Sequence, residues 1–185
     1  MKILLADDDA ARAGALACAL AADAALVVVR SDPARPLADQ VAEQAPDVVL
    51  VDMAHPDRDA LEGVRELSAR APHPVVLFVD RDDPAFMEQA IAAGVCSYNV
   101  TGVAPPDVKP ILRAAIALFR GHQQIRDELD DRRALERAKA LLIRDRRLAE
   151  PAAHRWLQRQ AMSSGRRIAE VAREVLRASD KTEGA

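Results

Sequence analysis

The stretch MKILLADDD, residues 1–9, decides the fold of the first part of the chain. It is a short apolar run that ends in aspartates, and VVLVD at 48–52 repeats the pattern. Continuous apolar runs of this length are typical of parallel strands that are buried on both faces. Further runs stand at 26–29, 75–79 and 96–100. We therefore expect five buried strands.

Helical patterns separate these strands. They lie at 10–22, 36–45, 58–71 and 84–93, and a further one begins at 106. Strands that alternate with helices predict an α/β fold with a doubly wound parallel sheet, here five-stranded and flavodoxin-like over residues 1–119. A long helix and a small three-helix bundle should follow. In such sheets, functional residues gather at the carboxyl ends of the strands.

Acidic side chains stand at two of these carboxyl ends. Asp7, Asp8 and Asp9 follow the first strand, and Asp52 closes the strand at 48–52. Converging carboxylates repel one another, so a folded site should need a cation, for which Mg²⁺ with its oxygen ligands is best suited. Asp9 could instead cap the next helix. We expect Asp7, Asp8 and Asp52 to form the site.

Residues 1–119 resemble a response-regulator receiver domain. The resemblance implies that Asp7 and Asp8 are the acidic pair and that Asp52 is the phosphoacceptor. It also implies that Ala54 offers its backbone carbonyl to the metal. In this chemistry the metal screens developing charge while Asp52 takes a phosphoryl group from a donor.

The resemblance also assigns the switch positions of the receiver. Tyr98 falls where the family has its switch aromatic. Val79 stands where the family usually has Thr or Ser, and Thr101 stands where it usually has Lys. Without that hydroxyl and that ammonium, a phosphoryl group on Asp52 would have little differential contact with an active state, and could not shift the equilibrium. We expect phosphorylation to be a poor switch here.

The charge of the chain is divided between its two parts. Residues 1–119 carry 10 basic and 18 acidic side chains, whereas residues 120–185 carry 16 basic and 11 acidic ones. Within 132–177 there are 13 basic side chains against 5 acidic ones, around three amphipathic helical patterns. A bundle with apolar inner faces would leave the arginines outside, which is the electrostatic footprint of a nucleic-acid binder.

Three short motifs add a second resemblance. AKALL at 138–142, LQRQAM at 157–162 and RRIAEVA at 166–172 resemble the ANTAR domain of the AmiR/NasT antiterminators, over 128–178. The resemblance implies binding to paired hairpins in nascent leader RNA. FVDRDDPAFMEQAIAAGVCSYNV at 78–100 is similar to the NasT branch, whose members are held by a sequestering nitrate- or nitrite-sensing protein. Control by a sensor histidine kinase through Asp52 remains the alternative.

Candidate RNA contacts follow from the arginine cluster and the family motifs. They are Lys139, Arg144, Arg159, Arg166 and Arg167, with Ala161 and Met162 of the family's Ala-Met motif. Arginine planes can stack on the unstacked bases of RNA loops. Trp156 falls on an apolar helical face and is expected in the core. A serine at 163 or 164 is expected to cap the last helix.

The connecting helix, 106–135, carries apolar residues at alternating steps of 3 and 4. These are Val108, Ile111, Ala115, Leu118, Ile125 and Leu129, with His122 completing the series. A heptad seam of this length predicts a coiled-coil homodimer; the alternative is one amphipathic helix that packs on its own receiver. Residues 179–185 read as a disordered tail.

Other classes of protein fit the sequence less well. It contains neither a signal peptide nor a run of transmembrane length, which predicts a cytoplasmic protein with no membrane partner. A Gly-rich phosphate loop and a nucleophile–His arrangement are both missing, so we expect no enzyme. Two alternatives to antitermination stay open: a DNA-binding response regulator, and a protein-interaction adaptor.

Overall fold

The computed structural model describes residues 1–7, 9–53, 58–100 and 105–183. It divides into two compact units. Met1–Gly121 is called the sheet unit here, and His122–Ala185 is called the helical unit.

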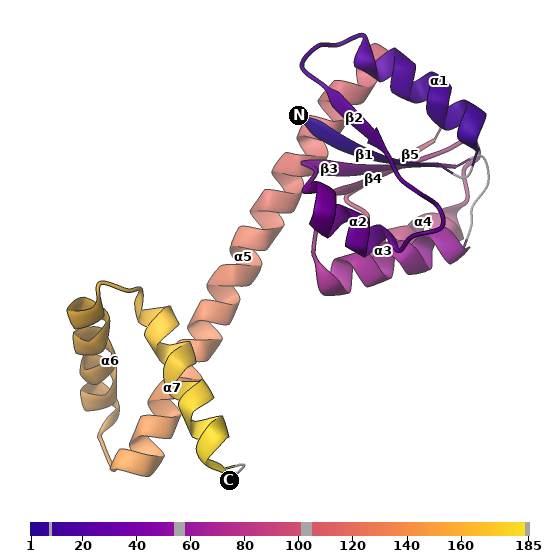
Figure 1. The fold of residues 1–185 in the computed structure, drawn as a ribbon. Helices are drawn as coiled ribbons and strands as arrows, with labels where there is room; N and C mark the ends of the chain where they lie inside the picture. Colours follow the sequence, from indigo (N-terminus) through magenta and orange to yellow (C-terminus); the bar gives the residue numbers. More distant parts are fainter. Residues whose placement is uncertain (8, 54–57, 101–104, 184–185) are drawn as a thin grey trace. The chain divides into compact units, whose positions relative to one another are not determined.

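Five parallel strands form the sheet, in the order β2-β1-β3-β4-β5 (Figure 1). They are β1 (Lys2–Asp7), β2 (Val27–Arg30), β3 (Val48–Met53), β4 (Val75–Val79) and β5 (Ser97–Val100). Each strand predicted from an apolar run is present, with bounds shifted by only a residue. The predicted doubly wound sheet is therefore confirmed.

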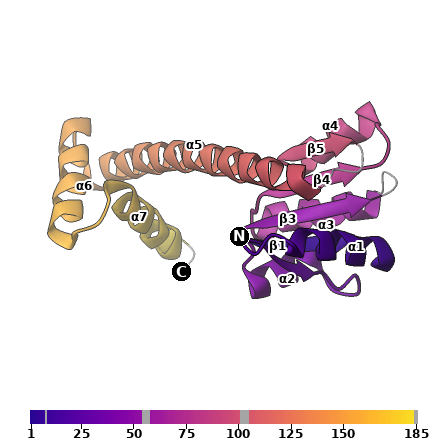
Figure 2. The same ribbon diagram turned by 90° about the horizontal axis from the view of Figure 1, so that it is seen from above.

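Helices cover both faces of this sheet (Figure 2). One face packs against α1 (Ala10–Ala21) and the start of α5 (Pro105–Arg146). The other face packs against α2 (Leu37–Gln44), α3 (Arg58–Arg70) and α4 (Pro84–Ala93). Neighbouring residues of β1 point to opposite cores: Ile3 lies with α1, and Leu4 lies with α2. Burial on both faces is why the strands are apolar throughout.

The carboxyl edge of the sheet brings acidic residues together. Asp7 at the end of β1 is the register partner of Asp52 near the end of β3. Asp80 follows the last residue of β4. Adjacent parallel strands lie about 4.8 Å apart, so these side chains leave the sheet as close neighbours.

The helical unit is built from the second half of α5, with α6 (Glu150–Ser164) and α7 (Ile168–Glu183). Its core is made of small and branched aliphatic side chains, with Ala138, Leu157 and Ala172 fully buried. The predicted small three-helix bundle is confirmed. Along the described residues, no helix is both long and apolar enough to cross a bilayer.

The predicted serine cap of the last helix is wrong. Ser163 and Ser164 belong to the last turn of α6, where both hydroxyls donate to the carbonyl of Gln160. Gly165 then ends α6 in the left-handed region, with φ at 63°. A Ser-Ser-Gly run can precede a helix or end one. Here Gly165 adopts the left-handed conformation of a helix C-cap, so the run ends α6.

Candidate functional sites

The acidic cluster at the sheet edge is built around an arginine. Arg12 lies in the first turn of α1, and its Nε is 3.1 Å from Asp7 Oδ2 and 3.5 Å from Asp52 Oδ2. Its Nη2 lies 3.3 Å from Asp7 Oδ1, and its Nη1 lies 3.5 Å from Asp80 Oδ2. One guanidinium therefore bridges carboxylates from three places along the carboxyl edge. Sequence reasoning missed Arg12, which lies five residues after Asp7.

Burial makes these contacts strong. The Asp7 side chain is 0% exposed and that of Asp52 is 15% exposed, while the Arg12 side chain is 25% exposed. Burial lowers the pKa of Arg12, but the hydrogen bond to Asp7 and the charges of Asp52, Asp7 and Asp80 outweigh it, so the pKa is raised. Asp7 and Asp52 also border a cleft of about 360 Å³ beside α2 and α3.

Asp9 has a different role from its neighbours. Its carboxylate accepts hydrogen bonds from the backbone N–H groups of Ala11 at 2.8 Å and Arg12 at 3.1 Å, as an N-cap does. Hydrogen bonds from these two backbone groups lower the pKa of Asp9. Its own N–H donates to Asp7 Oδ1 at 2.8 Å. Asp9 thus fixes the start of α1, and with it the position of Arg12.

Two of the expected switch positions, Val79 and Tyr98, are among the described residues. Val79 is 1% exposed and packs in the core, so it presents methyl groups rather than a hydroxyl at the end of β4. Tyr98 packs inward, its ring centroid 6.4 Å from that of Phe86 on α4. Asp8, Ala54 and Thr101 lie outside the described residues.

In the helical unit, Lys139 is placed differently from the exposed RNA contact that the sequence predicts. It is 9% exposed, and its ammonium lies 2.9 Å from a carboxylate oxygen of Glu136 and 2.8 Å from one of Glu150. The hydrogen bond to Glu150, followed by that to Glu136, raises the pKa of Lys139. This lysine ties α5 to the start of α6, a placement that favours a structural role.

The four predicted arginines are exposed, and three have acidic partners. Arg144 contacts Asp145 at 2.6 Å, and Arg166 contacts Glu174 at 2.6 Å. Arg167 lies 3.5 Å from Glu170 and has a 73% exposed side chain. Among the described residues Arg159 has no ion-pair partner, so it is the freest of the four for an external phosphate.

The Ala-Met motif is divided between core and surface. Ala161 is 8% exposed and packs in the bundle core, whereas the Met162 side chain next to it is 84% exposed. An exposed methionine on a basic helical surface contributes nothing to the core. Ala161 therefore suits packing, and Met162 suits an external contact.

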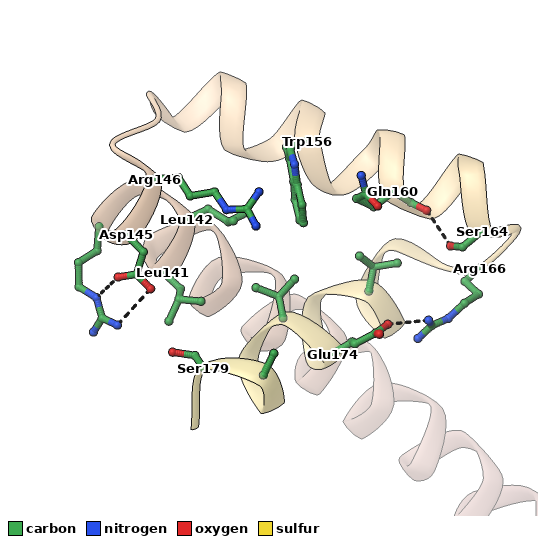
Figure 3. Close-up of a pocket in the computed structure, with 14 residues that line it drawn as sticks. Leu141, Leu142, Asp145, Arg146, Trp156, Gln160, Ser164, Arg166, Glu174 and Ser179 are labelled. Atoms are coloured by element: carbon green, nitrogen blue, oxygen red, sulfur yellow. Dashed lines mark hydrogen bonds and ion pairs between the residues drawn. The ribbon is translucent and has the colours of Figure 1, made fainter. Parts of the chain in front are cut away.

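A cleft of about 770 Å³ opens between the three helices of this unit. Trp156 of α6 and Arg146 of α5 point towards one another at its mouth (Figure 3), with the guanidinium carbon 4.6 Å from the ring centroid. Trp156 is only partly buried and borders the core. The sequence predicted it as a core residue and did not indicate the cleft, because only tertiary packing brings Arg146 over the ring.

Together, a five-stranded parallel sheet and an acidic cluster at its carboxyl edge define a receiver-type regulatory protein. The sequence matches the response regulator receiver domain over residues 3–103 and the ANTAR domain over residues 123–176. The chain therefore belongs to the response regulators, as a receiver domain followed by an ANTAR domain. This is a regulatory family rather than an enzymatic one.

Similar proteins agree with this assignment. The chain is 28% identical to the transcriptional regulatory protein PdtaR of Mycobacterium tuberculosis, over 95% of this chain and 90% of that protein. Among solved structures, it resembles the BeF3-activated receiver domain of Klebsiella pneumoniae RstA, at a TM-score of 0.54 and 24% identity. That match covers 63% of this chain and 98% of the other. The response regulator domain of Thermotoga maritima CheB matches equally well, at a TM-score of 0.54, 18% identity, and 63% and 96% coverage. At these identities the two structures bear on the fold alone.

Receiver domains typically bind Mg²⁺ at the phosphorylation site, and the described residues can be tested for this role. Both oxygens of Asp7 accept hydrogen bonds, from Arg12 and from the Asp9 N–H, and Asp52 also contacts Arg12. Within the described ranges no group of three or more acidic, His or Cys side chains is arranged to hold a metal. In the described part of this site, Arg12 and the Asp9 N–H therefore already occupy the Asp7 oxygens that Mg²⁺ would need, while Asp8 and Ala54, two other predicted ligands, lie outside the described residues.

Proposed function

We propose that this protein is a transcription antiterminator that binds paired hairpins in nascent leader RNA through its helical unit. The coincidence of the ANTAR match, 123–176, with the helical unit carries the proposal. The exposed arginines of α6 and of the segment between α6 and α7 supply the phosphate contacts that dominate nucleic-acid affinity. The printed name of PdtaR, a transcriptional regulatory protein, supports a role in transcription.

The sheet unit controls this activity. Buried Val79 offers no hydroxyl to a phosphoryl group, which favours a docking role over a phosphorylation switch. The partner proposed here is a sequestering protein that senses nitrate or nitrite, as in the NasT branch. A histidine kinase acting on Asp52 is the second candidate, because the carboxylate is retained at the carboxyl end of β3.

The second half of the heptad seam is free to pair with a second copy of α5. Leu118, Ile125 and Leu129 are 56%, 58% and 49% exposed, and they follow the spacing of a coiled coil. The first half of the seam is engaged, since Val108 and Ala115 are buried in the sheet unit. We propose a homodimer through the second half, which would present two helical units to the two hairpins.

A gel shift with a paired-hairpin leader RNA tests the function. Arg159→Glu is the preferred variant, because reversing Arg166 or Arg167 would also set like charges beside Glu170 and Glu174. The expected result is salt-sensitive binding by the wild type and weaker binding by the variant, with a salt slope smaller by about 1. Arg65→Glu, the same charge reversal at an exposed arginine on α3, is the charge-matched control and should leave RNA binding unchanged.

Competition and a phosphodonor separate the alternatives. Stronger binding to duplex DNA than to the hairpins would indicate a DNA-binding response regulator, whose last helix reads the major groove. Failure to bind either nucleic acid would indicate a protein-interaction adaptor. Acetyl phosphate with Mg²⁺ should leave hairpin affinity unchanged, and a marked increase would indicate kinase control instead.

A further inference from the structure

The position of Arg12 is fixed by the chain around it. Asp9 caps α1 through its side chain, and its N–H bonds to Asp7 at 2.8 Å. This cap fixes the backbone at the start of α1, and the packing of α1 against the sheet places the guanidinium of Arg12 against Asp7 and Asp52.

The cluster needs a positive charge to fold. Asp7 and Asp52 lie side by side in register on adjacent strands, and their side chains are almost fully removed from water. Two buried carboxylates this close would repel one another and lose their hydration, which destabilises the fold unless a cation pairs with them. The guanidinium is always charged, and its planar fork can pair with both oxygens of one carboxylate. It does this with Asp7.

We propose that Arg12 is the built-in cation of this cluster, and that a divalent metal can enter only by displacing it. Both carboxylate oxygens of Asp7, which would be metal ligands, already accept hydrogen bonds from N–H groups of Arg12 and Asp9. A divalent ion beside the guanidinium would also meet like-charge repulsion. The sheet unit is therefore stable without metal, and its affinity for Mg²⁺ is weak. This inference rests on the sheet unit alone and stands whether or not the helical unit binds RNA.

Metal titration of the full chain tests the proposal. Thermal denaturation is followed by far-ultraviolet circular dichroism with and without millimolar MgCl₂, and Mn²⁺ binding is followed by electron paramagnetic resonance. In the wild type, Mg²⁺ should leave the midpoint of the sheet unit unchanged. Arg12→Gln should melt earlier in the absence of metal, regain stability with Mg²⁺, and bind Mn²⁺ at least roughly tenfold more tightly, since one nearby charge is removed.

Controls separate this result from a general loss of stability. Arg65→Gln removes an exposed arginine of the same unit and should behave like the wild type in every measurement. Arg12→Lys keeps a charge but loses the fork, so its affinity for Mn²⁺ should lie between those of the wild type and Arg12→Gln. The wild type and Arg12→Lys decide the question even if Arg12→Gln does not fold. Tight wild-type binding of Mn²⁺, or equal affinity in the wild type and the Arg12 variants, overturns the proposal.

Discussion

Replacing Gly94 by alanine should destabilise the sheet unit strongly. Gly94 ends α4 with φ at 109°, and a Cβ built there would lie 2.2 Å from Ser68 Oγ and 3.0 Å from Ser68 Cβ on α3. The left-handed backbone costs a non-glycine residue about 1–2 kcal/mol. Overpacking against a helix adds about 1–3 kcal/mol. The expected loss in the free energy of unfolding is therefore roughly 2–5 kcal/mol.

Gly165 provides the matched control for this change. It ends α6 with φ at 63°, but an added Cβ would meet no atom within 4 Å. Gly165→Ala should thus show only the backbone cost, about 1–2 kcal/mol. Urea denaturation of the full chain measures both, because the single tyrosine, Tyr98, reports on the sheet unit and the single tryptophan, Trp156, reports on the helical unit.

A double variant isolates the steric part. Ser68→Ala removes the oxygen at 2.2 Å but keeps the Cβ at 3.0 Å, so it should recover part of the stability lost in Gly94→Ala. Equal losses in the two glycine variants, or no recovery with Ser68→Ala, would refute the packing argument.

Three further predictions concern the helical unit. Lys139→Met should lower the thermal midpoint of the helical unit, because the carboxylates of Glu136 and Glu150 lose the ammonium that they share. Trp156 fluorescence measures this midpoint. Hairpin affinity, measured well below the midpoint, should be unchanged. The hydrogen bond from Lys139 lowers the pKa of Glu150. The ion pair therefore contributes fully to the stability of the fold above the ordinary pKa of 4.5, and this contribution is lost as the pH falls and Glu150 is protonated. Glu150→Gln should accordingly flatten the acid side of the stability–pH curve. Met162→Gln should change stability by no more than about 0.5 kcal/mol, since the side chain is exposed, while weakening hairpin binding in the gel shift.

The sheet could be predicted from sequence because its strands are local signals. Val48–Met53 is apolar on both faces, and its register with β1 brings Asp52 beside Asp7, as the shared carboxyl edge requires. The N-cap role of Asp9 could be predicted for the same reason, since a cap bonds within three residues of itself. Such features depend on short stretches of chain.

The features that were missed depend on contacts between elements. The bond from Lys139 to Glu150 forms only because the chain turns between α5 and α6, where Arg147 has a φ of 52°. A lysine between two alanines of a helix gives no sign of that partner. Arg12 was missed for a similar reason, because its direction depends on how α1 packs against the sheet.

The environment of Asp52 bears on how the protein is controlled. Arg12 already pairs with the Asp52 carboxylate. Phosphorylation would therefore replace one anionic partner of Arg12 by another, and only the difference in free energy between these two ion pairs could shift the conformation. Val79 offers it no hydroxyl. Moving a two-state equilibrium from 1:99 to 99:1 takes about 5.5 kcal/mol of differential binding, whereas a protein partner that buries an interface of ordinary size can supply that much. Asp52→Asn should therefore leave hairpin affinity unchanged. If acetyl phosphate raises the affinity of the wild type but not that of Asp52→Asn, phosphorylation is the switch and the docking argument is wrong.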